Sequence, residues 1–165
     1  MKALVIIVFV LFGWQSEVPS AWEKAINKAV SGHFNNEKVQ IQFRLADQSM
    51  DDRPSPGIVI YDIMHDDGVS GYIVATSARG RYDYFDYLVI FNTDLIVLNV
   101  RVFEYRSDHG YEICNKKWLK QFENITGCGI HYGKDIDAIS GATISAASLT
   151  GDISALCDYL SRALK

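Results

Sequence analysis

The stretch YFDYLVIFNTDLIVLNVRVFEY at residues 84–105 indicates the class of fold that we expect for this chain. Residues 84–91 and 95–105 are rich in aromatic and β-branched side chains, which favour strands. Asn92, Thr93 and Asp94 lie between them and supply the residue types of a tight turn. The stretch therefore predicts a β-hairpin.

Shorter segments before this hairpin extend it into a sheet. Residues 57–63 and 71–75 are also rich in β-branched side chains, and apolar residues alternate with polar ones over residues 39–43, as in a half-buried strand. The polar stretch 46–56 contains two prolines and predicts a loop. Because consecutive strands with short connections pair with one another, we expect an antiparallel sheet.

Segments with apolar residues at helical spacing lie before and after the predicted strands. Ser20 and Glu23 have the spacing of a capping box, before a helix expected over residues 21–30. A second, short helix is expected over residues 118–125, where apolar residues recur on one face.

The C-terminal segment predicts an amphipathic helix, with Ser145 or Ser148 as the candidate N-cap residue. The sequence contains no internal repeat and no domain boundary after residue 20. We therefore predict a single α+β domain over residues 21–165, with an antiparallel sheet and flanking helices. The apolar residues at helical spacing are Leu149, Ile153, Leu156, Leu160 and Leu164.

Composition excludes one class of partner. The 165 residues carry a net charge of −4, and the lysines and arginines are scattered along the sequence. Proteins that bind nucleic acid concentrate basic residues instead. Nucleic-acid binding is therefore not expected.

The first twenty residues predict export. Lys2 precedes an almost wholly apolar run over residues 3–14, and small residues follow before Ala21. This pattern is typical of a secretory signal peptide, and the apolar run is shorter than the roughly 20 residues of a membrane span. We predict a signal peptide over residues 1–20, with an uncleaved membrane anchor as the alternative. The protein would then be periplasmic or lie on the outer face of the cytoplasmic membrane.

Export would place the three cysteines in an oxidising compartment. Cys114 and Cys128 are separated by a short segment, and we expect them to form a disulfide. Cys157 falls on the apolar stripe of the last helix and is expected to be a small core residue.

The segment DAISGATIS at residues 137–145 has the features of an anion-binding loop. Gly141 permits a tight turn and close approach of another group. The backbone N–H groups at the start of the following helix suit a phosphate, and the Thr143 hydroxyl would lie beside it. The same residues also suit an ordinary turn into a capped helix, so the physical argument alone leaves both interpretations open.

The motif DAISGAT at residues 137–143 resembles the flavinylation motif of the FMN-binding domain family. That family includes the C subunit of the sodium-pumping NADH:quinone oxidoreductase and the G subunit of ferredoxin:NAD oxidoreductase. The resemblance implies that a separate flavin transferase, using FAD and magnesium, attaches FMN to Thr143 through a phosphoester. It implies cofactor-binding roles for Asp137, Ser140, Gly141, Ala142 and Thr143.

The resemblance extends more loosely over the C-terminal two-thirds of the chain. The segment at residues 109–112 is similar to a His/Glu loop of the family, which implies that His109 and Glu112 line the flavin site. An exposed loop without that role is the alternative. This segment lacks a Thr-Pro-Gly run, and Ser145 stands where a threonine is frequent, so the chain is most similar to short standalone exported members.

These observations predict an electron carrier outside the cytoplasm, with FMN as cofactor. Its expected partners are a flavin transferase, a membrane-linked electron donor and an external acceptor. No catalytic residue and no metal site are predicted, because the redox chemistry belongs to the flavin. The alternatives are a flavin-dependent reductase of a small external substrate and a non-redox exported binding module.

Overall fold

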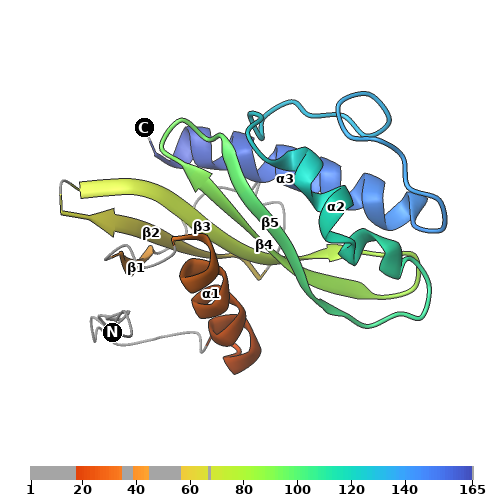
Figure 1. The fold of residues 1–165 in the computed structure, drawn as a ribbon, viewed down its shortest axis with the longest axis horizontal. Helices are drawn as coiled ribbons and strands as arrows, with labels where there is room; N and C mark the ends of the chain where they lie inside the picture. The colour runs from red at the N-terminus through yellow and green to blue at the C-terminus, as the bar shows by residue number, and fades with distance from the viewer. Residues whose placement is uncertain (1–17, 35–38, 45–56, 67, 165) are drawn as a thin grey trace.

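The computed structural model of the chain describes residues 18–34, 39–44, 57–66 and 68–164. Five strands form one open sheet in the order β1-β2-β3-β4-β5, and every neighbouring pair is antiparallel (Figure 1). The predicted α+β fold, with an antiparallel sheet and a C-terminal helix, is confirmed. The elements are α1 Ser20–His33, β1 Gln40–Arg44, β2 Val59–His65, β3 Gly68–Arg79, β4 Tyr84–Asn92, β5 Val97–Tyr105, η1 Tyr111–Cys114, α2 Lys116–Leu119, η2 Lys120–Phe122 and α3 Thr143–Ala163.

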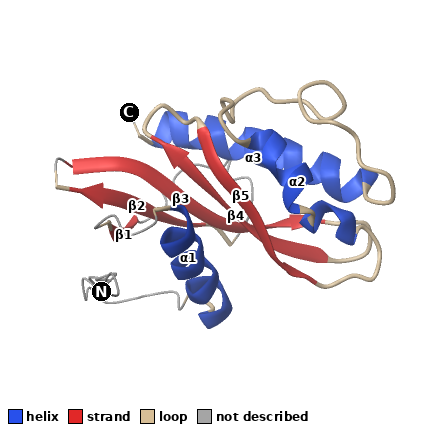
Figure 2. Cartoon of the chain, viewed as in Figure 1, coloured by secondary structure: helices blue, strands red, loops and turns tan. Residues whose placement is uncertain are grey.

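Helices cover both faces of the sheet, α2 and α3 on one and α1 on the other (Figure 2). Successive side chains of a strand point to opposite faces, so β4 is buried on both sides. Its residues Phe85, Tyr87, Val89 and Phe91 pack towards α3, whereas Leu88 and Ile90 pack towards α1. Each fully buried aliphatic side chain contributes about 1.5–3 kcal/mol relative to exposure.

The predicted hairpin is formed by β4 and β5, and hydrogen bonds to the Asn92 side chain stabilise its turn. The Asn92 side-chain oxygen accepts hydrogen bonds from the backbone N–H of Asp94 at 3.0 Å and of Ile96 at 2.9 Å. Leu95 takes a positive φ of 60°, which closes the turn. This turn holds the register of the two strands.

Three local predictions were wrong. Ser20 is the first residue of α1 rather than its cap, because Pro19 occupies the N-cap position and no side chain caps the helix. Ala142 precedes α3, so neither Ser145 nor Ser148 caps that helix. Phe43 in β1 is 43% exposed, although alternation predicted it inside.

The predicted disulfide was also wrong. Cys128 is bonded to Cys157, and Cys114 is free and half-buried. Packing explains the difference, because α3 crosses the loop around Gly127 and places Cys157 against it. The bridge ties that loop to α3.

Two predictions fall largely outside the described residues. The export segment lies there except for Val18, Pro19 and Ser20, and so does the loop at residues 46–56. None of the helices in the described part of the chain is long and apolar enough to cross a membrane.

Candidate functional site

The predicted flavin-attachment loop, residues 137–143, leads directly into α3; we refer to it as the Thr143 loop. Ser140 and Gly141 form a turn in which Gly141 has a φ of +87°, a conformation that other residues rarely adopt. Ala142 is buried, with 2% of its surface exposed, and anchors the end of the turn. Thr143 is the first residue of α3 and is exposed.

The backbone at the start of α3 has free donors. The N–H of Ala146 bonds the carbonyl of Ala142 at 2.8 Å, which begins the helical ladder. Among the described residues, nothing pairs with the N–H groups of Thr143, Ile144 and Ser145. These donors, at the positive end of a 21-residue helix, favour an anion.

The beginning of the loop is held against α2 and η2. Trp118 Nε1 donates to the carbonyl of Asp137 at 2.8 Å, and the Asp137 N–H donates to Gln121 Oε1 at 2.9 Å. The Asp137 side chain remains exposed. Its backbone therefore fixes the loop while its carboxylate faces solvent.

Glu112 lies against the turn of the Thr143 loop. A Cβ added at Gly141 would be 2.6 Å from Glu112 Oε1, so the carboxylate occupies the space that the glycine leaves. The structure thus brings Glu112 to the loop. A carboxylate here can accept hydrogen bonds from hydroxyl or N–H groups of a ligand.

His109 approaches the same end of α3 through Tyr105. The Tyr105 hydroxyl donates to the His109 carbonyl at 2.7 Å and lies 2.9 Å from Ser145 Oγ. The Tyr105 hydroxyl has a single proton, which it donates to the His109 carbonyl. The Ser145 hydroxyl therefore donates to the Tyr105 oxygen. Gly110, with a φ of +88°, lets the chain pass the Tyr105 hydroxyl.

Sequence reasoning missed Tyr105 and gave Ser145 the wrong role. Ser145 is 1% exposed and faces inward, towards the sheet. One signal was present, since Ser145 precedes Leu149 by four residues and so falls on the apolar stripe of the helix. A hydroxyl on a buried stripe requires a partner inside the protein.

A basic turn and exposed rings border the loop. The turn between β3 and β4 reaches α3, because a Cβ at Gly80 would lie 3.2 Å from Ser145 Oγ. The Arg81 guanidinium lies 5.2 Å from the centre of the Tyr82 ring, and that ring lies 5.4 Å from the ring of His109. Arg81 follows Gly80 in this turn and carries a positive charge, and the rings offer flat surfaces.

The most exposed large apolar side chains of the described residues gather here. Tyr82, Tyr111 and Ile144 are 62%, 64% and 53% exposed. Tyr111 lies in η1, with its ring 6.0 Å from that of Tyr105. Exposed apolar groups that cluster mark a surface for a ligand or partner.

A groove of about 560 Å³ lies elsewhere, between α1, β5 and α2. Its lining does not include any residue of the Thr143 loop. We base the candidate site on the loop rather than on this groove, because the exposed hydroxyl, the free N–H groups and the Arg81 turn converge at the loop. A ligand held at Thr143 would therefore lie at the surface.

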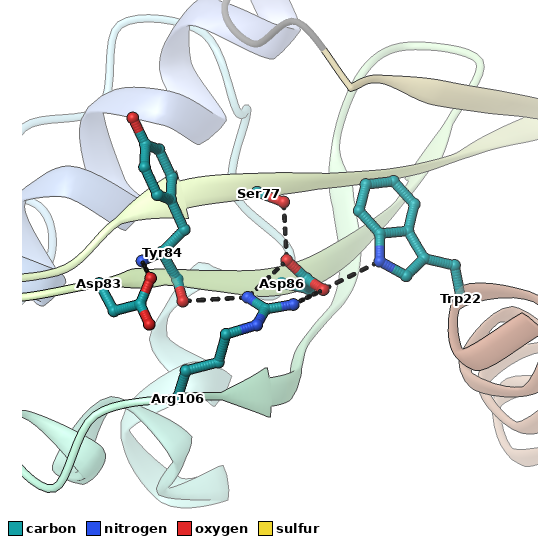
Figure 3. A network of polar contacts seen from close by, with 6 residues as sticks. All are labelled: Trp22, Ser77, Asp83, Tyr84, Asp86 and Arg106. Atoms are coloured by element: carbon teal, nitrogen blue, oxygen red, sulfur yellow. Dashed lines mark hydrogen bonds and ion pairs between the residues drawn. The ribbon is translucent and has the colours of Figure 1, made fainter. Parts of the chain in front are cut away.

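Asp86 forms a second polar centre, on the α1 face of the sheet (Figure 3). Its carboxylate accepts hydrogen bonds from Trp22 Nε1 at 2.9 Å, from Ser77 Oγ at 2.6 Å and from both terminal nitrogens of Arg106. Burial favours the neutral carboxyl, but the hydrogen bonds from Arg106, Ser77 and Trp22 outweigh it and lower the pKa of Asp86. Protein donors occupy this carboxylate, so its role is to hold α1 on the sheet.

The described residues contain no group of three or more His, Cys, Asp or Glu side chains that could hold a metal ion. No protein-family model matches this chain, and no curated protein matches it either.

Proposed function

We propose that this protein is an exported electron carrier that holds FMN at the Thr143 loop through a phosphoester with the Thr143 hydroxyl. The observation that carries the proposal is the exposed Thr143 at the start of α3, behind the left-handed Gly141 and beside unpaired backbone N–H groups. The resemblance of residues 137–143 to a flavinylation motif supports the choice of ligand.

The residues of the site fit FMN on physical grounds. The N–H groups of Thr143, Ile144 and Ser145 would hold the phosphate, and the Arg81 turn would add positive charge. The Tyr82 and Tyr111 rings would flank a flat ring system. When bound, the flavin supplies reversible electron transfer.

Attachment requires a transferase, because a threonine hydroxyl is a weak nucleophile at neutral pH. Thr143 Oγ1 would form a bond to the phosphorus of the FMN half of FAD, and the pyrophosphate bond would break with AMP as the leaving group. The hydroxyl proton would pass to a base of the transferase. The exposure of Thr143 gives such an enzyme access.

Two further observations support the carrier over the alternatives. The Cys128–Cys157 disulfide is typical of a protein that works in an oxidising compartment, which agrees with export. The surface position of Thr143 suits electron exchange with protein partners. A reductase of a small substrate would need a substrate pocket beside the ring.

The test is intact mass after coexpression with a flavin transferase. We expect the wild type to gain one FMN with loss of one water, and Thr143→Ala to gain nothing. Thr93→Ala changes another exposed threonine, in the β4–β5 turn, and should be modified like the wild type. An unmodified wild type beside a transferase that modifies a known substrate would overturn the proposal.

Ser140→Ala separates the two exposed hydroxyl groups of the loop. We expect this variant to retain the added mass, since the phosphoester is assigned to Thr143. Rapid turnover of a small acceptor by the isolated flavinylated protein would favour the reductase alternative instead.

A further inference from the structure

The groove of about 560 Å³ runs along the outer edge of β5, the last strand of the sheet. Six consecutive residues of this strand, from Asn99 to Glu104, line it. Its two walls are α1 and the helical segment made of α2 and η2, which cover opposite faces of the sheet. We call it the β5 groove.

The backbone edge of β5 is open within this groove. On its inner side β5 pairs with β4. On its outer side, the start of the strand is covered, because Val97 exchanges backbone hydrogen bonds with Asn124 and Ile125. From Asn99 to Glu104, no described residue bonds the outer backbone groups. An open strand edge is a template for pairing with another extended segment.

Both walls carry lysines at helical spacing. Lys24 and Lys28 are four residues apart on α1, and Lys116 and Lys120 are four residues apart on the opposite wall. All four are exposed, and none forms an ion pair with a described residue. Residues four apart lie on the same side of a helix, so each wall presents a row of two positive charges.

The groove is basic in a protein that is acidic overall. Arg101 adds a fifth cation, whereas Glu104 and Glu123 are the only acidic residues in the lining. Glu123 already accepts a hydrogen bond from Asn99 Nδ2 at 3.1 Å. The chain as a whole has a net charge of −4, so the excess of positive charge is local. A negatively charged partner would be attracted to it.

We propose that the β5 groove binds an extended acidic segment of a partner protein, which adds a sixth strand to the sheet. Main-chain hydrogen bonds to β5 would provide the pairing. Alternate side chains of the added strand would point to the two faces of the sheet, one set towards α1 and the other towards α2. Acidic residues in both sets would therefore meet lysines.

Charge distinguishes this partner from the other candidates. A second copy of the chain paired through its own β5 would bring the lysine rows of both copies together, and like charges repel. Residues 1–17 contain Lys2 and Glu17 as their only charged side chains, so that segment has no net charge to offer. Of these three candidates, an acidic segment from another protein is the complementary occupant.

This site is separate from the flavin site and does not depend on it. The two are close, because η1 carries Glu112 to the Thr143 loop and Cys114 to the groove. A partner docked on β5 would thus lie near the proposed cofactor. Binding can be measured on Thr143→Ala protein, so failure of one proposal is distinguishable from failure of the other.

The experiment measures fluorescence anisotropy with a fluorescein-labelled peptide of eight residues, in which pairs of glutamates alternate with pairs of threonines so that both faces of the added strand carry glutamate. We expect saturable binding to the wild type, and no binding of the same peptide with lysine in place of glutamate. Reversing one wall, by Lys24→Glu with Lys28→Glu or by Lys116→Glu with Lys120→Glu, should weaken binding by about tenfold or more. The matched control, Lys117→Glu with Lys134→Glu, reverses two exposed lysines outside the groove and should change the affinity by less than about twofold.

Two measurements distinguish strand addition from general attraction between charges. Methylation of alternate backbone nitrogens of the peptide, in the frame that faces β5, should abolish binding because it removes the main-chain donors. Bound peptide should also slow modification of Cys114 by N-ethylmaleimide, since Cys114 is the free thiol and lines the groove. The proposal is overturned if both methylation frames leave affinity unchanged, if the control pair weakens binding as much as the wall pairs, or if the acidic peptide does not bind. Self-association of the wild type that Lys24→Glu with Lys28→Glu strengthens would point to a second copy and would also overturn it.

Discussion

Two carboxyl groups on opposite faces of the sheet have pKa values that are shifted in opposite directions. Asp86, on the α1 face, accepts four hydrogen bonds, from Trp22, Ser77 and Arg106, and they lower its pKa. Asp152, on α3, accepts one hydrogen bond, from the buried Tyr87 hydroxyl at 2.5 Å. Burial raises the pKa of Asp152 to about 6. The hydrogen bonds and the positive charge of Arg106 favour the ionised form of Asp86, whereas burial favours the neutral form of Asp152.

Buried polar atoms without a hydrogen-bond partner among the described residues occur on both sides of the sheet. Asn27 Oδ1 lies on α1, and the Tyr159 hydroxyl and Thr76 Oγ1 lie on the α3 side. The free N–H groups of Thr143, Ile144 and Ser145 also belong to α3. The two faces thus differ in their central carboxyl groups, since Asp86 has four donors and Asp152 has one, and the candidate site lies at the start of α3.

The largest effect is expected from Asp86→Ala. Trp22 Nε1, Ser77 Oγ and Arg106 would lose their common acceptor, and α1 would lose its polar attachment to β4. Removing one partner of a buried charged network costs about 3–5 kcal/mol, so the free energy of unfolding should fall by that amount in urea denaturation.

Asp83→Ala is the control for this prediction, because Asp83 is exposed and its side chain accepts just one hydrogen bond among the described residues, from the N–H of its neighbour Tyr84. We expect a loss below about 0.5 kcal/mol. The contribution of Asp86 should also be lost as pH falls. Its folded pKa is lowered, so the stability is present above the unfolded pKa near 4 and disappears below it. Equal losses in the two alanine variants would contradict the structural role of Asp86.

Removal of the Cys128–Cys157 disulfide should have the next largest effect. The bond closes a segment with a sequence separation of 29 and ties the loop around Gly127 to α3. A loop of this length corresponds to about 2–4 kcal/mol of stabilisation, so Cys128→Ala with Cys157→Ala should lower the free energy of unfolding by that amount. Cys114→Ala, at the free cysteine, should cost less, and thiol titration of the unfolded wild type should find one free thiol. Three reactive thiols would show that the bridge does not form.

The disulfide also shows where sequence reasoning failed. Cys114 and Cys128 are closer in sequence, but α3 packs across the loop and brings Cys157 to Cys128. Such pairing depends on long-range packing, which spacing does not report. The turn at Asn92 was predictable because its hydrogen bonds to Asp94 and Ile96 are local.

The extent of β3 was underestimated for a related reason. Residues 71–75 were predicted, but the strand runs from Gly68 to Arg79. Thr76 and Ser77 broke the apolar pattern, yet Ser77 is satisfied by Asp86 on the neighbouring strand. A polar residue inside a strand is compatible with burial when a partner crosses from the next strand.

The candidate site was predictable only where its residues are consecutive in the sequence. The Thr143 loop could be read directly from residues 137–143, but α3 begins at Thr143, before the predicted N-cap residues Ser145 and Ser148. The contact between Glu112 and Gly141 was not predicted, because it depends on how η1 packs against the Thr143 loop. The bond between Tyr105 and Ser145 spans forty residues. Helical spacing indicates that Ser145 is buried, but it does not identify Tyr105 as the partner.

Asp152→Asn should stabilise the protein at neutral pH. The folded pKa of about 6 lies above the ordinary 3.8, so folding penalises the charged form at pH 7. Each pKa unit corresponds to about 1.4 kcal/mol, and a gain of about 1–3 kcal/mol is expected. The Tyr87 hydroxyl can still donate to the amide oxygen of the variant, because burial raises the pKa of Tyr87 well above its ordinary value and keeps its proton.

The pH dependence identifies the cause of this gain. The wild type should become more stable as pH falls from about 7 to about 4, because the folded state takes up the Asp152 proton first. The variant lacks that contribution, so the two proteins should converge near pH 4. A constant difference between pH 4 and pH 8 would show that charge burial is not responsible.

The smallest effect on stability is expected from Gly141→Ala, and Gly133→Ala is its matched control. Both glycines have a positive φ, +87° and +80°, so alanine should cost about 1 kcal/mol at either position. Only at Gly141 would the new Cβ meet another group, the Glu112 carboxylate; nothing lies within 4 Å at Gly133. That carboxylate ends an exposed, flexible side chain and can move away, so the two variants should unfold at similar urea concentrations.

The two variants should differ in flavin attachment, because Gly141→Ala alters the turn before Thr143 while Gly133→Ala leaves it intact. Measured by intact mass beside a transferase, only Gly141→Ala should lose the FMN; equal attachment in both variants would contradict a role for the Gly141 turn.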